Sequence, residues 1–526
     1  MSVWESKLKK TSYGQKNHSL NRSINSVLLI QPPAFCNNMR TDMNSNIPLG
    51  LAYIGAVLEK DGYTVKILDA LTEGFEIEER VSPEKLRIGL PFGEIEKYIK
   101  EIAPDVIGIS SMFSSQRKNA HAVALIAKKI NPNLKVIMGG AHPTAAPESV
   151  LEDPNIDFII LGEGENSIVP LIECIEKEGD YSKLDGIGYR DNNNEIVINP
   201  KTKYVKDLDS IPFPARHLLP MDKYFSAGIR HGGRGHGKRA VSVVTTRGCP
   251  YKCNFCTAFK VFSRHPRLRT PENVLAEIRE LIEDYNVDEI FFEDDQLLAK
   301  RSRALELLTG LKQYNLFWDT PNGVSPWLLN DEVLMKMKES GCYRVNLAVE
   351  SGSQSVLKEL INKPVRLDQV PELVKKIRQY GMEPGMFLVV GNIGSERVET
   401  LDEVRQSFRF ARKLKIYPHA SILTAYPGSK VLSIAEEKGY LVQGFEWDSL
   451  LINKPQLQTP EWSPSELLAV LEQERIKTRW WLILSSPIKS FNIIIEHFFQ
   501  SPSETIRKLF LFLNQGLKSI LRSSSI

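Results

Sequence analysis

Short apolar, β-branched runs alternate with segments of helical periodicity, and this alternation limits the fold more than any other feature of the chain. In the first stretch that shows it, the runs are Val27–Gln31, Val65–Asp69, Val106–Ser110, Val136–Gly139 and Phe158–Gly162. Continuous apolar strands separated by helices are typical of a parallel sheet covered on both faces. We therefore predict an α/β chain whose first domain, residues 26–180, is a doubly wound, Rossmann-like sheet.

The same alternation begins again after a connector rich in Asn, Asp, Pro and Gly, which we assign to residues 181–239. Six strands are predicted over residues 240–450: Val241–Thr246, Glu289–Glu293, Leu316–Asp319, Arg344–Glu350, Met386–Gly391 and Ser421–Thr424. The first helix of this series has a clear start, with Thr270 as N-cap and Pro271 at the first helical position. Six strand–helix units indicate a partial (β/α)6 barrel, with its site at the carboxyl ends of the strands.

The two ends of the chain differ from these domains. Residues 1–25 are polar and basic and are predicted to be disordered. Residues 451–526 have helical patterns only, and from residue 475 onward eight Lys and Arg stand against two acids, a net charge of +6. Apolar residues between Ile506 and Leu521 fall on one helical face, and Trp480-Trp481 lie upstream. This pattern suits a helix in an anionic membrane interface, but also helices that pack on the barrel or on a second copy.

Composition excludes several classes of protein. The 526 residues have ordinary apolar and charged fractions and a net charge of +3, which argues against disorder and against a dedicated nucleic-acid binder. Six cysteines in so long a chain do not form a secreted disulfide framework. There is neither a secretory signal nor a run of about 18 apolar residues. We expect a cytoplasmic protein, in peripheral contact with the membrane if the tail lies in an interface.

The predicted strand ends carry the residues expected to bind ligands. Ligands of doubly wound sheets lie beyond the carboxyl ends of the strands, and glycine there allows the backbone to approach a large, flat or anionic ligand. In the first domain these positions hold Ser110, Ser111, Gly139, Gly140, His142, Gly162, Glu163 and Gly164.

Three cysteines follow the first strand of the second series. Cys249, Cys253 and Cys256 have C-x3-C-x2-C spacing on one predicted loop, so their thiols can turn toward a common point. Zinc would need four closed ligands, and there is no second CxxC pair. An iron–sulfur cubane held by three thiolates leaves one iron open to a further ligand. Packing cysteines are the simpler alternative, but the spacing and placement favour the cluster.

At these residues the sequence resembles the radical S-adenosylmethionine (SAM) superfamily, whose C-x3-C-x-aromatic-C signature has Phe255 as its aromatic residue here. The resemblance implies a [4Fe-4S] cluster on the three cysteines, with SAM on the open iron and a 5′-deoxyadenosyl radical formed by one-electron reduction. Five residues end or follow three of the predicted strands and, together with Phe255, are expected to contact SAM. They are Glu293 and Asp294, Glu350 and Ser351, and Asn392. The alternative for the acids is helix N-capping. The loop after the fifth strand lacks the proline that many members have there.

The first domain resembles the cobalamin-binding domain that precedes some radical SAM domains, through Pro48–Ile54, Gly139–Pro143 and Gly162–Glu165. The resemblance implies that the Gly- and Ser-rich strand ends listed above hold cobalamin. No Asp-x-His-x-x-Gly motif supplies an axial histidine, and His142 is expected to hydrogen-bond locally rather than bind cobalt. The stretches Glu350–Ile361, followed by Lys363-Pro364, and Ile211–Ala215 resemble phosphonate C-methyltransferases, although such stretches serve fold and cofactor rather than substrate.

These features predict a cobalamin-dependent radical SAM C-methyltransferase that acts on an unactivated carbon of a small-molecule or lipid substrate. A flavodoxin- or ferredoxin-type protein would supply electrons, and no catalytic residue is named. A radical SAM cyclase or rearrangement enzyme that keeps both cofactors is the second hypothesis. A non-enzymatic corrinoid- or redox-sensing module is the third. A methylthiotransferase is disfavoured because only Cys36 and Cys174 precede the cluster motif.

Overall fold

The first half of the chain is built on a seven-stranded sheet. The computed structural model describes residues 22–37, 45–83, 85–227, 235–450 and 454–485. The strand order is β10-β9-β8-β7-β6-β1-β3. The five predicted strands form its parallel part, and the strands are β1 (Ser26–Gln31), β3 (Thr64–Asp69), β6 (Val106–Ser110), β7 (Lys135–Gly139), β8 (Phe158–Ile160), β9 (Ile187–Arg190) and β10 (Ile196–Ile198).

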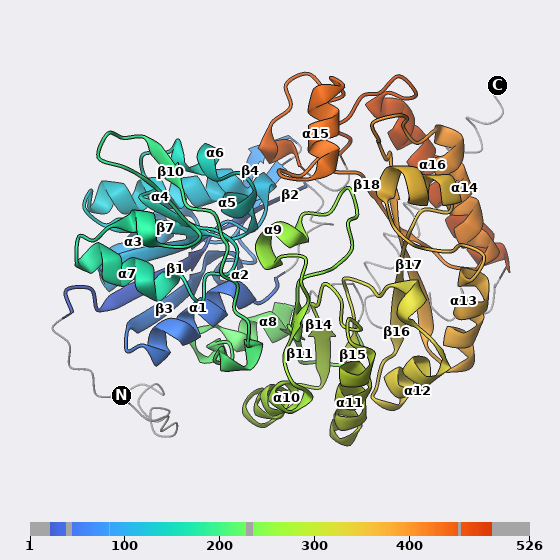
Figure 1. Cartoon of the computed structure of the whole chain (residues 1–526), viewed down its shortest axis with the longest axis horizontal. Helices are drawn as coiled ribbons and strands as arrows, with labels where there is room; N and C mark the ends of the chain where they lie inside the picture. Colours follow the sequence, from blue (N-terminus) through green and yellow to red (C-terminus); the bar gives the residue numbers. More distant parts are fainter. Residues whose placement is uncertain (1–21, 38–44, 84, 228–234, 451–453, 486–526) are drawn as a thin grey trace.

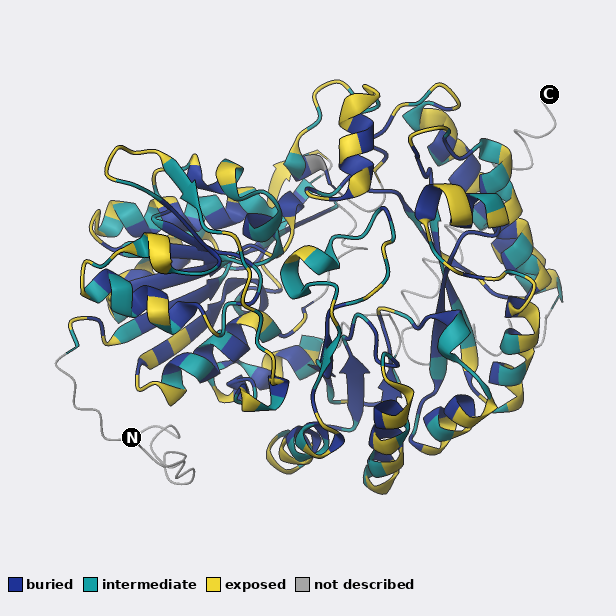
Figure 2. Cartoon of the chain, in the orientation of Figure 1, coloured by how far each residue is buried: buried dark blue, intermediate teal, exposed yellow. Residues whose placement is uncertain are grey.

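Helices cover both faces of this sheet (Figure 1). Along β1, Val27 and Leu29 belong to one apolar core, and Leu28 and Ile30 belong to the other. Because successive side chains of a strand point to opposite faces, this run is apolar throughout. One face contacts α1 (Leu49–Lys60) and α7 (Ile168–Glu176), and the other contacts α3 (Phe92–Ile102) and α4 (Arg117–Ile130). Figure 2 shows buried strands beneath helices that are exposed only on their outer sides.

Two parts of this half differ from the sequence prediction. The antiparallel pair β9–β10 extends the sheet to residue 198, inside the stretch assigned to the connector from residue 181. A small antiparallel sheet, in the order β2-β5-β4, was not predicted, and its strands are β2 (Ala34–Asn37), β4 (Glu78–Ser82) and β5 (Lys85–Ile88). The strands of this small sheet are four or five residues long and partly exposed, and their polar residues hide the apolar signal.

The second half contains the six predicted parallel strands as two three-stranded sheets, which we call the six-stranded unit. One sheet has the order β11-β14-β15, the other β16-β17-β18, and single bridges join Trp318 to Cys342 and Val324 to Leu347. The strands are β11 (Ala240–Val243), β14 (Glu289–Phe292), β15 (Phe317–Asp319), β16 (Arg344–Glu350), β17 (Glu383–Val390) and β18 (His419–Ile422). Outside them lie α10 (Pro271–Tyr285), α11 (Arg301–Leu311), α12 (Asp331–Glu339), α13 (Val370–Gln379) and α14 (Leu401–Lys413), whereas α15 (Lys430–Glu437) lies apart from that row, at the top of Figure 1.

The last described helix is α16 (Pro464–Ser485), which packs along α14. Glu474 on α16 pairs with Arg412 on α14 at 2.6 Å, and both are largely buried. No helix in the described part of the chain has the length and apolarity of a membrane span. Of the residues predicted to be disordered, 1–21 lie outside the described residues, whereas Ile24 is buried and donates its backbone N–H to Glu176. The basic tail predicted from residue 475 begins on α16, and its part after residue 485 lies outside the described residues.

Candidate active site

The cysteine loop, residues 248–266, leaves the first strand of the six-stranded unit. The predicted strand Val241–Thr246 is divided, because β11 ends at Val243 and β12 (Thr246–Arg247) turns to pair with β13 (Arg267–Leu268). The loop between β12 and β13 carries the three predicted cysteines and then α9 (Ala258–Phe262). Gly248 begins the loop with φ +91°, and a Cβ there would lie 2.8 Å from the His265 carbonyl oxygen. Only glycine fits this tight entry.

Asn254, between the second and third cysteines, fastens the loop to the rest of the unit. Its backbone N–H donates to the Ile361 carbonyl at 3.0 Å, and its side-chain amide donates to the Leu360 carbonyl at 2.7 Å. Both acceptors belong to a π-helical turn, Val356–Ile361, that follows β16. The Asn254 carbonyl accepts from the backbone N–H of Val431 on α15. The loop is therefore held against the carboxyl ends of β16 and β18.

A buried ion pair lies beside the thiols. The Lys363 ammonium and the Glu350 carboxylate are 2.6 Å apart, and their side chains are 8% and 9% exposed. Burial raises the pKa of the Cys253 thiol to about 12, and Lys363 opposes this shift. Burial likewise raises the pKa of Cys249 and Cys256. A nearby cation and a partly enclosed position are what an anionic, thiolate-held group requires.

The donor set fits an iron–sulfur cluster better than a single ion. All three cysteines are free and half-buried. Within the described ranges, no group of three or more His, Cys, Asp or Glu side chains is arranged to hold one metal ion. Three thiolates can hold a cubane iron–sulfur cluster and leave one iron open to a further ligand, whereas a structural zinc ion needs four protein ligands. The residues present therefore fit a cluster held by Cys249, Cys253 and Cys256.

The residues predicted to contact SAM have different surroundings. Glu350 lies at the carboxyl end of β16 with φ +72°, beside the cysteine loop. Glu293 accepts a hydrogen bond from the Ser242 hydroxyl at 2.9 Å. Phe255 packs partly buried against the main core. These three positions keep their predicted role as an expectation.

Three others are fully buried and hydrogen-bonded within the protein. Asp294 is buried and accepts from Thr245 at 2.9 Å and from the Thr246 backbone N–H, so it caps the end of β11. Ser351 is buried against Ser407 of α14, with the two hydroxyls 3.1 Å apart. The Asn392 side-chain amide donates to the Val389 carbonyl and to Glu399. These partners favour a structural role over direct contact with SAM.

Two residues near the thiols were not among the predicted SAM contacts. Asp295 accepts from the backbone N–H of Gly248 at 3.3 Å, and burial raises its pKa to about 6. Lys363 follows the π-helical turn. The sequence placed Asp295 in an acidic strand end, but it could not show which acid of the three turns toward the loop.

The carboxyl edge of the seven-stranded sheet has room for a ligand. A Cβ on Gly139 would meet no atom within 4 Å, whereas one on Gly140 would lie 2.6 Å from the Ser111 carbonyl oxygen. The Ser111 hydroxyl is buried without a partner, and Ser110 ends β6 beside it. Met112 and Phe113 continue that edge and are 46% and 61% exposed. An open backbone position, an unpaired hydroxyl and exposed apolar side chains fit a large, flat, amphipathic cofactor such as a corrinoid.

His142 hydrogen-bonds locally, as the sequence suggested. Its Nδ1 lies 2.9 Å from the Ser114 hydroxyl, and the side chain is 1% exposed. Burial lowers its pKa to about 4. The imidazole is therefore neutral and packed beneath the edge rather than presented on it.

The two halves meet at the cysteine loop. Helix α5 (Ala141–Ala145), which follows β7, contacts α9, as the centre of Figure 1 shows. A Cβ on Gly162 would lie 3.1 Å from the Val261 carbonyl oxygen of α9. Gly164 packs against Ile54 of α1, and Glu163 pairs with arginines of the six-stranded unit. The loop Gly162–Glu165 thus lies in the seam between the halves rather than on the open edge.

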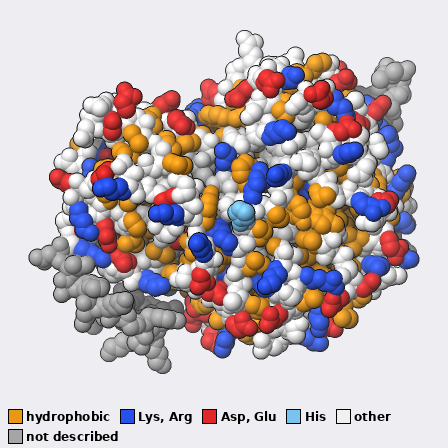
Figure 3. All heavy atoms as spheres, viewed as in Figure 1, with side chains coloured by type: hydrophobic (Ala, Val, Ile, Leu, Met, Phe, Trp, Pro, Cys, Tyr) orange, Lys and Arg blue, Asp and Glu red, His pale blue; other side chains and the backbone are white. Residues whose placement is uncertain are grey.

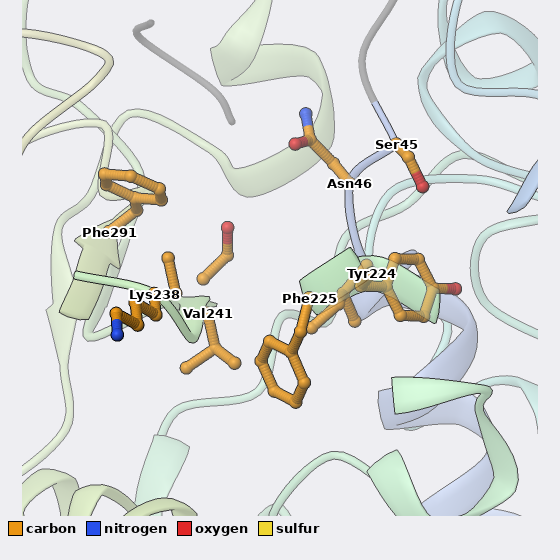
Figure 4. A pocket seen from close by; sticks show the side chains of 10 residues that line it. Ser45, Asn46, Tyr224, Phe225, Lys238, Val241 and Phe291 are labelled. Carbon is orange, nitrogen blue, oxygen red and sulfur yellow. The ribbon is translucent and has the colours of Figure 1, made fainter. Parts of the chain in front are cut away.

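A small cavity of about 30 Å³ lies between the halves, beside β11 (Figure 4). Its lining includes Ser45, Tyr224, Lys238, Val241 and Phe291, but none of the three cysteines. This volume holds about one water molecule and is far too small for a cofactor.

Comparisons with known proteins agree with this architecture. Residues 40–172 match the B12 binding domain, and residues 243–411 match the radical SAM superfamily. The chain is 35% identical to the cytidylyl-2-hydroxyethylphosphonate methyltransferase of Streptomyces wedmorensis, over 80% of this chain and 83% of that protein. It is 26% identical to the anaerobic magnesium-protoporphyrin IX monomethyl ester cyclase of Rubrivivax gelatinosus, over 80% and 71%.

Among solved structures, the cobalamin-dependent SAM radical enzyme OxsB with aqua-cobalamin bound superimposes with a TM-score of 0.66. The match covers 96% of this chain and 81% of that one at 16% identity, so it bears on the fold alone. The matched domains and the similarity to the phosphonate methyltransferase over most of both sequences establish the relationship. This chain belongs to the cobalamin-dependent radical SAM family, in its methyltransferase branch.

Proposed function

We propose that this protein transfers a methyl group from a corrinoid to an unactivated carbon of an anionic small molecule. One observation carries the proposal: the open edge of the seven-stranded sheet and the cysteine loop meet where α5 contacts α9. Two cofactors that act on one substrate must lie on either side of that substrate. The six-stranded unit would act as the partial barrel expected from the sequence.

When bound, SAM at a reduced cluster would supply a radical for hydrogen abstraction, and a corrinoid would supply the methyl group. Cys249, Cys253 and Cys256 would hold the cluster. Lys363 would offset its negative charge, and it orients Glu350, whose second carboxylate oxygen would accept a hydrogen bond from the SAM amine or ribose. The corrinoid would lie against the carboxyl edge of the seven-stranded sheet, at Ser111, Gly139 and Gly140.

The proposed substrate is a phosphonate or phosphate ester. The relative of highest identity reported above carries a phosphonate substrate in its name. Lys and Arg side chains also gather across the middle of the face in Figure 3, around the place of α9 in Figure 1. Lys252 and Lys260 are exposed on the loop itself. Positive potential at a site entrance attracts anionic substrates.

The same exposed lysines suit an acidic one-electron carrier of the flavodoxin or ferredoxin type as reductant.

We further propose that the basic tail after residue 485 lies on an anionic membrane. Its sequence pattern supports this, as does the exposure of Leu484, 76%, at the end of α16.

The test uses protein that is purified without oxygen, reconstituted with iron and cobalamin, and given methyl-deuterated SAM, a reductant and a cytidylylated hydroxyalkylphosphonate. Mass spectrometry should find 5′-deoxyadenosine, S-adenosylhomocysteine and a labelled methyl group in the acceptor. Deoxyadenosine without labelled methyl would favour the cyclase hypothesis, and neither nucleoside product would favour the sensing module. Replacing Cys253 with Ala should abolish deoxyadenosine and leave the corrinoid bound. Replacing Cys174, which lies on α7, should change neither.

A further inference from the structure

Two arginines close the base of the cysteine loop. Arg247 ends β12 and Arg267 begins β13, and the two are direct cross-strand partners. The loop they delimit, residues 248–266, contains all three cysteines and α9. The distance between these two arginines therefore determines how tightly the loop is drawn together.

Both arginines pair with one carboxylate from the other half of the molecule. Glu163, in the loop after β8, lies 3.2 Å from an Arg247 terminal nitrogen through Oε1 and 2.7 Å from an Arg267 terminal nitrogen through Oε2. Its Oε2 also accepts from the backbone N–H of Val205 at 2.9 Å. Glu165 takes the second terminal nitrogen of Arg247 at 2.5 Å.

This cluster of charges is almost free of solvent. The side chain of Glu163 is 0% exposed, Arg247 is 6% and Arg267 is 11% exposed. Two guanidinium groups this close repel each other unless a carboxylate lies between them. Removing one partner from a buried pair leaves the other charges uncompensated, which costs far more than the loss of a surface ion pair.

We propose that Glu163 is a positioning residue that clamps the two ends of the cysteine loop and fixes the loop against the corrinoid-binding half. The sequence had assigned this residue to the cobalamin site. In the structure both carboxylate oxygens of Glu163 pair with arginines at the contact between the two halves, so its effect on the corrinoid is indirect. The inference rests on the proposed function only for the identity of the group that the loop holds.

The clamp is tested first on cofactor-free protein by amide hydrogen exchange. Glu163→Gln keeps the shape of the side chain but removes the charge, and residues 248–266 should then exchange about tenfold faster or more. The matched control is Glu474→Gln, which removes an equally buried carboxylate from the pair with Arg412 between α14 and α16. The control should leave exchange in residues 248–266 at the wild-type rate. Equal exchange of this loop in both variants would overturn the proposal.

A second pair of measurements separates the clamp from a direct cobalamin contact. After reconstitution, Glu163→Gln should release cluster iron to a chelator several-fold faster and change the electron paramagnetic resonance spectrum of the reduced cluster. Its affinity for cobalamin, titrated by absorbance, should stay within about twofold. Weakened cobalamin binding with an unchanged cluster would restore the assignment made from the sequence and refute the clamp.

A milder variant covers the case in which Glu163→Gln does not fold. Arg267→Lys keeps the charge but loses the fork, in which one terminal nitrogen reaches Glu163 and the Val205 carbonyl and the other donates to the Phe262 carbonyl. It should raise exchange and iron release in the same direction by a smaller factor. These readouts do not require methyl transfer, so they stand if the proposed reaction is wrong.

Discussion

Lys363 and Glu350 are expected to stabilise the cysteine loop as a coupled pair, and a double-mutant cycle measures that coupling. Lys363→Met leaves a buried carboxylate, Glu350→Gln leaves a buried ammonium, and the double variant leaves neither. Their 2.6 Å separation corresponds to an attraction of about 6 kcal/mol at an effective dielectric constant of about 20. Most of this attraction is offset by the cost of removing both charges from water.

Each single variant should therefore lose about 3–5 kcal/mol of local stability. The double variant should lose about 2–3 kcal/mol less than the sum of the two singles. The change also reaches the thiols, because Lys363 is the main group that opposes the raised pKa of Cys253. Without it fewer thiolates form at neutral pH, so Lys363→Met should also slow cluster assembly.

Native-state amide exchange over residues 350–363 of the cofactor-free protein gives the local opening free energies for the cycle. Iron uptake during reconstitution gives the second readout. A coupling below about 0.5 kcal/mol would mean that the two charges act independently. That result would refute the reasoning, since a pair at this distance and burial cannot be formed without coupling.

Three further predictions follow from single positions. Gly139→Ala should leave the stability of the cofactor-free protein almost unchanged, because the added Cβ meets no atom within 4 Å. It should weaken cobalamin binding, measured by titration, at least about tenfold. Equal affinity in the variant and the wild type would exclude this edge as the cobalamin site. Burial raises the pKa of Glu399 from 4.5 to about 7. The folded protein therefore binds this proton more tightly than the unfolded chain does, and the resulting contribution to the free energy of unfolding is fully present below pH 4.5 and is lost as the pH rises through 7. Glu399→Gln should thus have the same free energy of unfolding as the wild type near pH 4.5, but a value about 3 kcal/mol higher above pH 7. Thermal unfolding at a series of pH values measures this, and a difference between the two proteins that does not change with pH would contradict the prediction. Truncation after Ser485 should abolish flotation with anionic vesicles at unchanged cluster content, and persistent binding would refute an interfacial tail.

Local signals predicted the elements well. β6 and β16 have the predicted bounds, and Thr270 caps α10 by accepting from the Asn273 backbone N–H. These features depend on residues that are close in sequence, such as an apolar run or a hydroxyl before a proline. The hairpin β9–β10 was missed because its turn, Asp191–Asn194, has the composition of a connector.

The site was predicted where a motif fixed it and missed where distant residues complete it. Cys249, Cys253 and Cys256 were assigned to the cluster from their spacing and from the resemblance to the radical SAM signature, and this assignment stays a prediction. Glu163 is 84 residues from Arg247, and no periodicity relates their positions. Its glycine-flanked sequence resembled a ligand loop, whereas the fold directs the side chain into the seam. Lys363 was noted in the sequence only as part of a stretch that resembles other methyltransferases, and its pairing with Glu350 was not predicted, since the π-helical turn brings it back to that residue.

The connector itself helps to join the two halves. Arg216, in the stretch between them, pairs at 2.7 Å with Glu277 on α10, which also pairs with Arg269. All three side chains are at most 6% exposed. A corrinoid domain grafted from another protein without Glu163 and Glu165 would leave Arg247 and Arg267 unmatched, and a foreign connector would leave Glu277 without Arg216. Domain shuffling at the connector is therefore disfavoured, and functional chimeras should arise only when both halves and their connector are exchanged together.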